Sequence, residues 1–188
     1  SDLDTCTGCH EEAAGEIMTT THWTWEHVDA ASGQTLGKRH VINNYCVAVP
    51  SNEPRCTSCH IGVGWTDVRQ DFWDENAVDC LVCHETTGTY VKTPTGAGAP
   101  DPNLDLVTIA RSVGQRLPDR HNCGVCHFYG GGGNAVKHGD LDSTMENPTT
   151  SLDVHMGVDG NNFQCIDCHV DRGPDGTDDP LHQLVGTR

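Results

Sequence analysis

The sequence predicts a mostly irregular fold with a few short helices, built around bound cofactors instead of a large aliphatic core. Hydrophobic residues make up 35% of the chain and aromatic residues 5%, while 21 of its 188 residues are Gly and 9 are Pro. Such a composition favours disorder unless something besides the chain supplies the interior. The pattern Cys-x-x-Cys-His recurs five times, at Cys6–Cys9–His10, Cys56–Cys59–His60, Cys80–Cys83–His84, Cys123–Cys126–His127 and Cys165–Cys168–His169.

This pattern is the attachment motif of c-type haem. The two thiols add to the two vinyl groups of haem, and the adjacent histidine reaches the iron. Random placement of 11 Cys and 12 His would give far less than one copy. A zinc ribbon needs no His after each Cys pair, and a dithiol redox pair normally occurs once, near a βαβ pattern. We therefore predict a multihaem cytochrome c whose chain wraps around five covalently bound haems, and whose apo-chain does not fold.

The spacing of the motifs is too unequal for a repeat architecture, so residues 1–188 are predicted to form a single five-haem domain. Weak helical character follows the first motif, and apolar residues at near-helical spacing, Leu104, Val107, Ile109 and Val113, predict a clearer helix that ends before Pro118. In chain order, we expect helix over 10–20, short strands near 45–49 and 89–92, a loop over 93–103, helix over 104–116, a loop over 130–134 and an exposed acidic tail over 171–180.

The net charge of −16 excludes a nucleic-acid partner, which requires basic surface, and favours redox partners with basic patches. No apolar run approaches twenty residues, so no membrane span is predicted. Haem is attached covalently outside the cytoplasm, which predicts a periplasmic, cell-surface or extracellular location. The polar opening SDLDTC is typical of a processed mature form.

Each motif histidine (His10, His60, His84, His127 and His169) is expected to supply one axial iron ligand. Electron-transfer haems take a second ligand, commonly His or Met. The chain has three methionines, Met18, Met145 and Met156, and seven further histidines. We predict mainly bis-histidine ligation and hence low reduction potentials, with the second ligands drawn from His22, His40, His121, His138, His155 and His182. His27 is the weakest candidate, because it closes the HWTWEH cluster that His22 begins.

Two residues fall outside these roles. Cys46 belongs to no motif, and is either a small buried hydrophobe, a thiol that faces substrate, or one half of an intermolecular disulfide. Lys137 follows the run Gly130–Gly133 and is either a solvated side chain or, if burial keeps its amine neutral, an iron ligand. A haem with an amine on one face and an open second face would be catalytic.

The segments around these residues carry a family resemblance. HWTWE (22–26), residues 37–65 with NNYCVAVPS, ENAVDCLVCHETTGTY (75–90), residues 122–143 with GGGGNAVKHGD, and LDVHM (152–156) are similar to the octahaem tetrathionate reductase family. The resemblance implies one active haem with a lysine ligand and a nearby free cysteine, which match Lys137 and Cys46, and reduction of tetrathionate, nitrite or hydroxylamine. The family has eight haems and this chain five motifs, so it resembles the N-terminal part, as a fragment or as a shortened relative.

Three functions remain open. The first is transfer of single electrons along a close-packed chain of six-coordinate haems. The second is an oxyanion reductase at the haem of Cys56 and Cys59, with Lys137 on its iron. The third is a homo-oligomer or extracellular conducting filament, in which His182 of one chain binds a terminal haem of the next. The first and third are compatible, and electron transfer with other cytochromes or redox proteins is the favoured interpretation.

Overall fold

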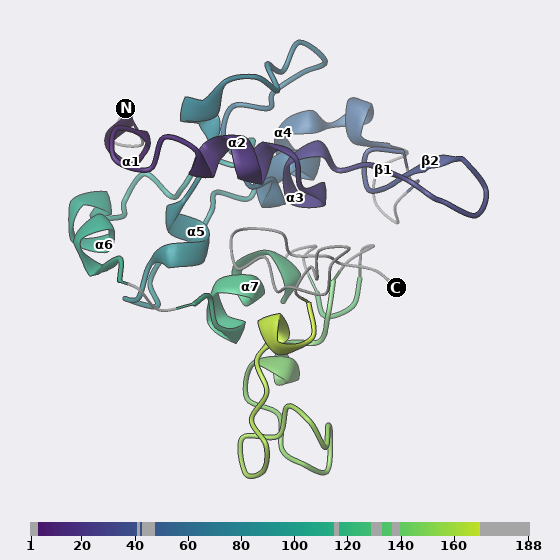
Figure 1. Cartoon of the computed structure of the whole chain (residues 1–188), viewed down its shortest axis with the longest axis vertical. Coiled ribbons are helices and arrows are strands. Elements are labelled where there is room, and N and C mark those ends of the chain that lie inside the picture. The colour runs from purple at the N-terminus through teal and green to yellow at the C-terminus, as the bar shows by residue number, and fades with distance from the viewer. Residues whose placement is uncertain are drawn as a thin grey trace.

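The computed structural model describes residues 4–40, 42, 48–114, 117–128, 133–136 and 140–169. Within these ranges short helices are joined by turns and loops (Figure 1). The α-helices are α1 (Asp4–Thr7), α2 (Ala13–Met18), α3 (Thr21–Thr24), α4 (Glu53–Cys56), α5 (Leu81–His84), α6 (Leu106–Ser112) and α7 (Arg120–His127). The 3-10 turns are η1 (Val49–Ser51), η2 (Thr57–Cys59), η3 (Glu75–Ala77), η4 (Ser143–Glu146) and η5 (Cys165–Asp167). A two-residue antiparallel ladder pairs β1 (His27–Val28) with β2 (Thr35–Leu36).

Helical turns coincide with the Cys-x-x-Cys-His motifs. Cys6 lies in α1, Cys56 ends α4, Cys80 caps the N-terminus of α5, α7 contains the whole fourth motif, and Cys165 begins η5. Residues at positions i, i+3 and i+4 share one face of a helical turn. This local geometry therefore directs the two thiols and the imidazole of a motif to the same side.

Several expected elements are present with different bounds. The weak helix over 10–20 is observed as α2, and the helix over 104–116 is shorter, because the Asp105 side chain accepts the Thr108 N–H and so fixes the start of α6. Only Ile109 of the expected apolar face is fully buried, since Val107 and Val113 are exposed. The strand near 89–92 is a single bridge from Lys92 to Pro100, and near 45–49 the described part, from Ala48, leads into η1.

Two small clusters form the apolar interior. The larger contains Trp23, Leu81, Val82, Tyr90 and Ile109 and lies among α2, α3, α5 and α6. The second is mainly aromatic and surrounds the end of α4, with buried Trp25, Val49, Cys56 and Trp65. Polar residues are also fully enclosed, among them His60, Asp79 and Glu85. The interior is therefore thin and polar for a protein of this length, as its composition predicted.

The loop over 93–103, which the sequence predicted, folds back over the second motif. Gly98 has a φ of +85°, and a Cβ there would stand 2.0 Å from the Gly62 carbonyl oxygen, so glycine is required for this close approach. The loop is also tied down by the Ala97 N–H, which donates to the Pro54 carbonyl at 3.0 Å.

Residues 141–164 form a separate lobe at the bottom of Figure 1, below α7. Aspartate side chains organise its turns: Asp142, Asp153 and Asp159 accept backbone N–H groups of Thr144, Met156 and Thr150. Buried Arg120 of α7 anchors the lobe by donating to the Glu146 carbonyl at 3.1 Å and to the Asn162 side chain. Among the described residues, no helix is long and apolar enough to cross a membrane.

Candidate haem-binding sites

Backbone hydrogen bonds close a helical turn across the first, third and fifth motifs. In each of them the histidine N–H donates to the carbonyl of the first cysteine, at 2.9 Å for His10, 3.1 Å for His84 and 2.9 Å for His169. The second motif is tighter, because the His60 N–H donates to the Thr57 carbonyl at 2.9 Å. The sequence Cys-x-x-Cys-His thus needs only one turn of helix to gather the groups that bind haem.

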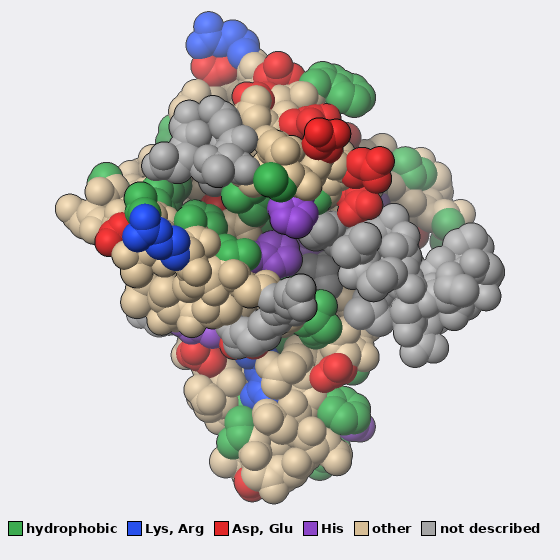
Figure 2. Space-filling view, turned by 60° about the vertical axis from the view of Figure 1, so that its left-hand side comes forward, with side chains coloured by type: hydrophobic (Ala, Val, Ile, Leu, Met, Phe, Trp, Pro, Cys, Tyr) green, Lys and Arg blue, Asp and Glu red, His purple; other side chains and the backbone are tan. Residues whose placement is uncertain are grey.

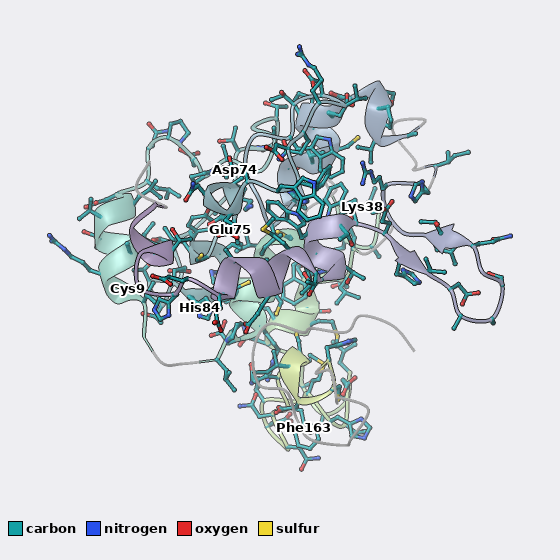
Figure 3. All side chains as sticks on the ribbon, turned by 45° about the horizontal axis from the view of Figure 1, so that its top comes forward. Cys9, Lys38, Asp74, Glu75, His84 and Phe163 are labelled. Carbon is teal, nitrogen blue, oxygen red and sulfur yellow. The ribbon has the colours of Figure 1, made fainter. Side chains whose placement is uncertain are left out.

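The motifs lie against one another in space. The Cys6 thiol lies close enough to Cys80 to raise its pKa, which puts the first motif beside the third. The Cys123 and Cys165 thiols likewise shift each other's pKa, which puts the fourth motif beside the fifth. Figure 3 draws Cys9 and His84 on the same flank of the molecule, as the first of these contacts requires.

The second motif joins the same assembly. The Cys59 thiol donates to the Cys126 carbonyl oxygen at 3.8 Å. Cys83 is close enough to Cys126 to influence its ionisation, and α5 packs against α7. The fourth motif is therefore the centre of the arrangement, with the second, third and fifth beside it and the first beyond the third.

The cysteines of the third motif are neutral thiols. Burial raises the pKa of Cys83 to about 12, with a further contribution from the Asp79 carboxylate. Burial also raises the pKa of Cys80 to about 11, and Cys6 and Asp79 add to that shift. A neutral thiol is compatible with an apolar partner such as the haem edge.

His60 is enclosed by aromatic rings. Trp23, Trp25 and Trp65 have ring centroids 5.2, 5.3 and 5.1 Å from that of His60. The His60 Nε2 is 2.7 Å from the Trp23 carbonyl oxygen, and its Nδ1 accepts the Gly62 N–H at 3.1 Å. Burial lowers the pKa of His60 to about 4, so the imidazole is neutral. Both ring nitrogens are engaged with the protein, so ligation of iron through Nε2 requires the Trp23 carbonyl contact to be released.

His22 lies next to the histidine of the fourth motif. The His22 and His127 ring centroids are 6.3 Å apart, with the ring planes at 89°. Burial, with a smaller contribution from nearby His127, lowers the pKa of His22 to about 4. Neutral imidazole is the form that binds metal. Histidines also gather at the centre of the face in Figure 2, beside hydrophobic side chains and below a group of Asp and Glu.

His121 has the hydrogen bonding of a metal-ligating histidine. Its Nδ1 lies 2.9 Å from the Glu146 carboxylate, while its Nε2 is buried without a hydrogen-bond partner. Histidines that bind metals usually donate their second ring N–H to a carboxylate, which fixes the tautomer and orients the ring. Glu146 itself carries no sequence signal for this role, because η4 lies far along the chain from α7.

The other predicted distal ligands are spread over the surface. His40 is exposed and 2.7 Å from Glu26, His155 stacks on Phe163 with 6.3 Å between ring centroids, and His27 is exposed in β1. Figure 3 places Phe163 in the lobe below α7. His138, His182, Cys46 and Lys137 lie outside the described residues. Within the described ranges, no group of three or more His, Cys, Asp or Glu forms a self-contained metal site.

Buried polar atoms provide a test of whether haem fits. In the described part of the chain, four buried side-chain atoms have no hydrogen-bond partner: Asp79 Oδ1, Glu85 Oε1, Arg120 Nε and His121 Nε2. Such groups are rare in folded proteins and call for a partner. The Arg120 guanidinium N–H suits a haem propionate, and the His121 imidazole nitrogen suits the haem iron. The residues present therefore fit the cofactor that the motifs predict.

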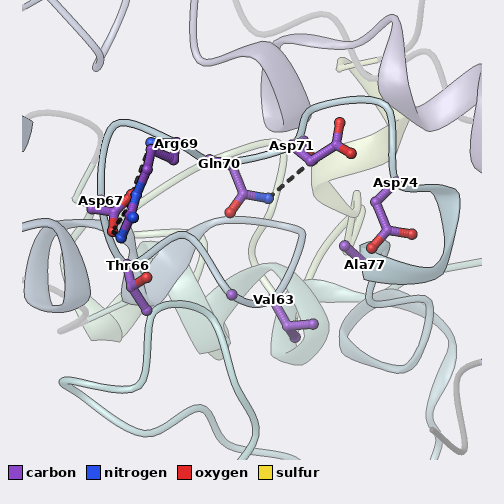
Figure 4. A pocket seen from close by; sticks show the side chains of 9 residues that line it. Val63, Thr66, Asp67, Arg69, Gln70, Asp71, Asp74 and Ala77 are labelled. Carbon is purple, nitrogen blue, oxygen red and sulfur yellow. Dashed lines mark hydrogen bonds and ion pairs between the residues drawn. The ribbon is translucent and has the colours of Figure 1, made fainter.

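A depression of about 340 Å³ opens between Val63 and Ala77 (Figure 4). Three carboxylates line it, Asp67, Asp71 and Asp74. Arg69 is paired with Asp67, and its side chain is 85% exposed. None of the lining residues belongs to a Cys-x-x-Cys-His motif. The acidic lining makes this depression unsuited to an anionic substrate.

The fold and the helical Cys-x-x-Cys-His turns define a multihaem cytochrome c fold, as the sequence predicted. The chain is similar to the crystal structure of octaheme cytochrome c from Shewanella oneidensis, with a TM-score of 0.83 and 53% sequence identity. That match covers 98% of this chain and 39% of the octahaem protein, so the chain spans about two fifths of its length. The resemblance therefore holds at the level of multihaem cytochromes.

Two further comparisons complete the picture. An uncharacterised protein of Archaeoglobus fulgidus is 24% identical over 216 residues, which cover 88% of this chain and 71% of that protein. No protein-family model matches the chain.

Sequence reasoning missed the residues that enclose the motifs. Asp79 directly precedes Cys80, and its carboxylate accepts the Tyr90 hydroxyl and lies 3.1 Å from the Lys92 ammonium. The Lys92 ammonium also donates to the His60 carbonyl at 2.6 Å. This buried group connects the second and third motifs. No spacing rule connects the three residues, and the sequence marks Lys92 only as one of three lysines in an acidic chain.

Proposed function

We propose that this chain is an electron-transfer protein that binds five c-type haems and passes single electrons between them. One observation carries the proposal: the five motifs are neighbours in a connected set, with Cys6 beside Cys80, Cys59 beside Cys126 and Cys123 beside Cys165, while α5 of the third motif packs against α7 of the fourth. A thioether fixes the edge of a haem next to its sulfur, so haems attached at neighbouring motifs lie edge to edge. Close contact between haem edges is what electron transfer requires.

The order of contacts gives the route. Electrons that enter at the first motif pass the third and reach the fourth, from which the second and fifth are both accessible. The chain contributes one axial histidine per motif and, from its remaining histidines, the second ligands that keep each iron six-coordinate. When bound, haem supplies reversible one-electron chemistry, while the chain positions the rings and limits the access of water.

The cellular location and the partners that we propose follow from the chemistry of haem attachment and from the net charge. Covalent haem attachment places the protein outside the cytoplasm, in the periplasm, on the cell surface or beyond it. A net charge of −16 favours redox partners with basic patches. Assembly with further copies of itself, up to a conducting filament, is a compatible extension in which a histidine such as His182 binds a haem of the adjacent chain.

Electron paramagnetic resonance of the oxidised holoprotein tests the proposal. Transfer without catalysis predicts low-spin signals that account for all five haems, and a redox titration with five low potentials. A high-spin signal that integrates to one whole haem would count against pure electron transfer, because it marks an iron with an open face.

A second candidate is a reductase of tetrathionate, nitrite or hydroxylamine at a lysine-ligated haem. The contact of Cys59 with Cys126 favours it, because the second motif then lies beside the end of α7, and Lys137 follows that helix in the sequence. In this function Lys137 binds the iron at Cys56 and Cys59, and Cys46 faces substrate. Turnover of these oxyanions with reduced methyl viologen, lost in Lys137→Ala at unchanged haem content, would support it. No turnover with any of them removes it.

A further inference from the structure

His22 and His127 are held by two elements far apart in the chain. α3 carries His22 and is fixed by its neighbour Trp23, which is 1% exposed and donates its indole N–H to the Phe72 carbonyl at 3.0 Å. α7 ends at His127, and the Leu141 N–H donates to the His127 carbonyl at 2.6 Å. Both imidazoles therefore project from anchored backbone.

The spacing of the two rings is that of ligands on opposite sides of one metal. Two imidazoles that bind one ion from opposite sides through bonds of about 2 Å hold their ring centroids about 6 Å apart. The observed separation is 6.3 Å. His127 belongs to the same helix as the haem-attachment residues Cys123 and Cys126.

The remaining described histidines outside the motifs are committed elsewhere. His40 pairs with Glu26, His155 stacks on Phe163, and His27 lies exposed in β1. His121 is held by Glu146 through Nδ1, in contact with neither His22 nor His127 by any described bond, and its Nε2 is left for a different iron. The ring contact between His22 and His127 joins a histidine outside the motifs to a motif histidine.

We propose that His22 and His127 are the two axial ligands of the haem attached at Cys123 and Cys126. This inference rests on the proposed function, because it takes that haem as bound. It assigns a particular second ligand to the haem at the centre of the electron route. The planes of the two rings lie at 89° to each other, so the proposal gives that haem two nearly perpendicular imidazole ligands. Low-spin ferric haem with perpendicular ligands has a strongly anisotropic electron paramagnetic resonance signal with a large maximum g value.

The test compares holoproteins with His22→Ala and His27→Ala, two removals of a histidine from the same segment. Intact mass first counts the haems in each protein. Failure of the proposed function would appear as missing haem in the unaltered chain. Five haems in the unaltered chain and in both variants therefore show that the test concerns ligation alone. His22→Ala is expected to convert one low-spin haem of five to high spin, to abolish the signal of large maximum g, and to recover both on addition of imidazole. His27→Ala is expected to change neither.

The assignment to the fourth motif is tested in a background without that haem, Cys123→Ala with Cys126→Ala. There His22→Ala is expected to produce no additional high-spin haem. A high-spin haem that still appears would place His22 on another iron and overturn the assignment. If the protein with Cys123→Ala and Cys126→Ala cannot be recovered, the signal of large maximum g provides the test. Its persistence in the single variant His22→Ala overturns the pairing of His22 with His127. Five unchanged low-spin haems in His22→Ala overturn the role of His22 altogether.

Discussion

The Lys92 ammonium lies 3.1 Å from the Asp79 carboxylate, and the two side chains are 5% and 0% exposed. The same carboxylate accepts the Tyr90 hydroxyl. Burial of the Tyr90 phenol, together with the Asp79 charge, raises the pKa of that phenol well above the usual value. Lys92 contacts the backbone of His60 and Asp79 precedes Cys80, so the pair connects two haem motifs through the interior. A buried ion pair at this point fixes the position of one motif relative to the other.

Lys92→Met should therefore destabilise the holoprotein severely. It leaves the Asp79 carboxylate buried without its cation, at a cost of about 3–5 kcal/mol. Denaturant unfolding, followed by far-ultraviolet circular dichroism, measures the loss. Arg69→Met is the matched control, since Arg69 pairs with Asp67 on the exposed surface and its removal should leave the midpoint unchanged. Equal midpoints for the two variants would contradict a structural role for the buried pair.

Arg120→Met should loosen the lobe of residues 141–164. Arg120 is 4% exposed and donates to the Glu146 carbonyl and the Asn162 side chain, and hydrogen bonds from a charged donor contribute about 1.5–3 kcal/mol each. Hydrogen exchange with mass spectrometry should show faster exchange in peptides from the lobe and unchanged exchange in α6. Arg111→Met on exposed α6 is the control. If exchange in the lobe peptides is equally fast in the Arg120→Met and Arg111→Met variants, Arg120 does not anchor the lobe.

Glu146→Gln should raise the potential of one haem. With His121 bound to iron through Nε2, the Glu146 carboxylate at Nδ1 makes the imidazole more basic and stabilises ferric iron. Glutamine keeps a hydrogen bond but removes the charge, so ferric iron loses that stabilisation. Spectroelectrochemical titration measures the shift, with Glu75→Gln in η3 as a control of equal charge change. Five potentials that do not move relative to that control would exclude His121 as a ligand.

Acid should release the turns of the lobe. Backbone N–H groups hold the pKa values of Asp142, Asp153 and Asp159 below the ordinary value. A carboxyl group whose pKa is lower in the folded protein stabilises it above the unfolded value, and this contribution is lost as pH falls through the folded value. Protection of lobe peptides should therefore decline below about pH 4. Asp153→Asn should make that decline shallower. Protection that stays constant from about pH 5 to about pH 2 would contradict this prediction.

The sequence predicted the fold class because the decisive information is local. Five short motifs, few apolar residues and many turn residues specify helical turns on an irregular chain, whatever the packing. The expected start of α6 was two residues early because the Asp105 cap, and not apolar spacing, decides where the helix starts. The helix ends at Ser112 because the backbone of Val113 leaves the helical conformation. The hairpin of β1 and β2 has too little periodicity to be predicted.

The surroundings of the motifs could not be predicted for a different reason. The aromatic enclosure of His60 combines Trp23, Trp25, Trp65 and Phe72 from segments that meet only after folding. Pairing of His22 with His127 likewise depends on how α3 and α7 pack. Sequence reasoning could name His22 and His121 as ligand candidates by residue type, but only the packing gives each of them a partner.

Intact-mass spectrometry under denaturing conditions tests the central claim most directly. Protein secreted by a host with c-type haem maturation should carry the mass of five haems, retained after acid and organic solvent because the thioether bonds are covalent. Each variant in which both cysteines of one motif are replaced by Ala should lose one haem equivalent. The mass of the bare polypeptide from that host would contradict the account, because nothing else supplies the interior around which these helical turns are arranged.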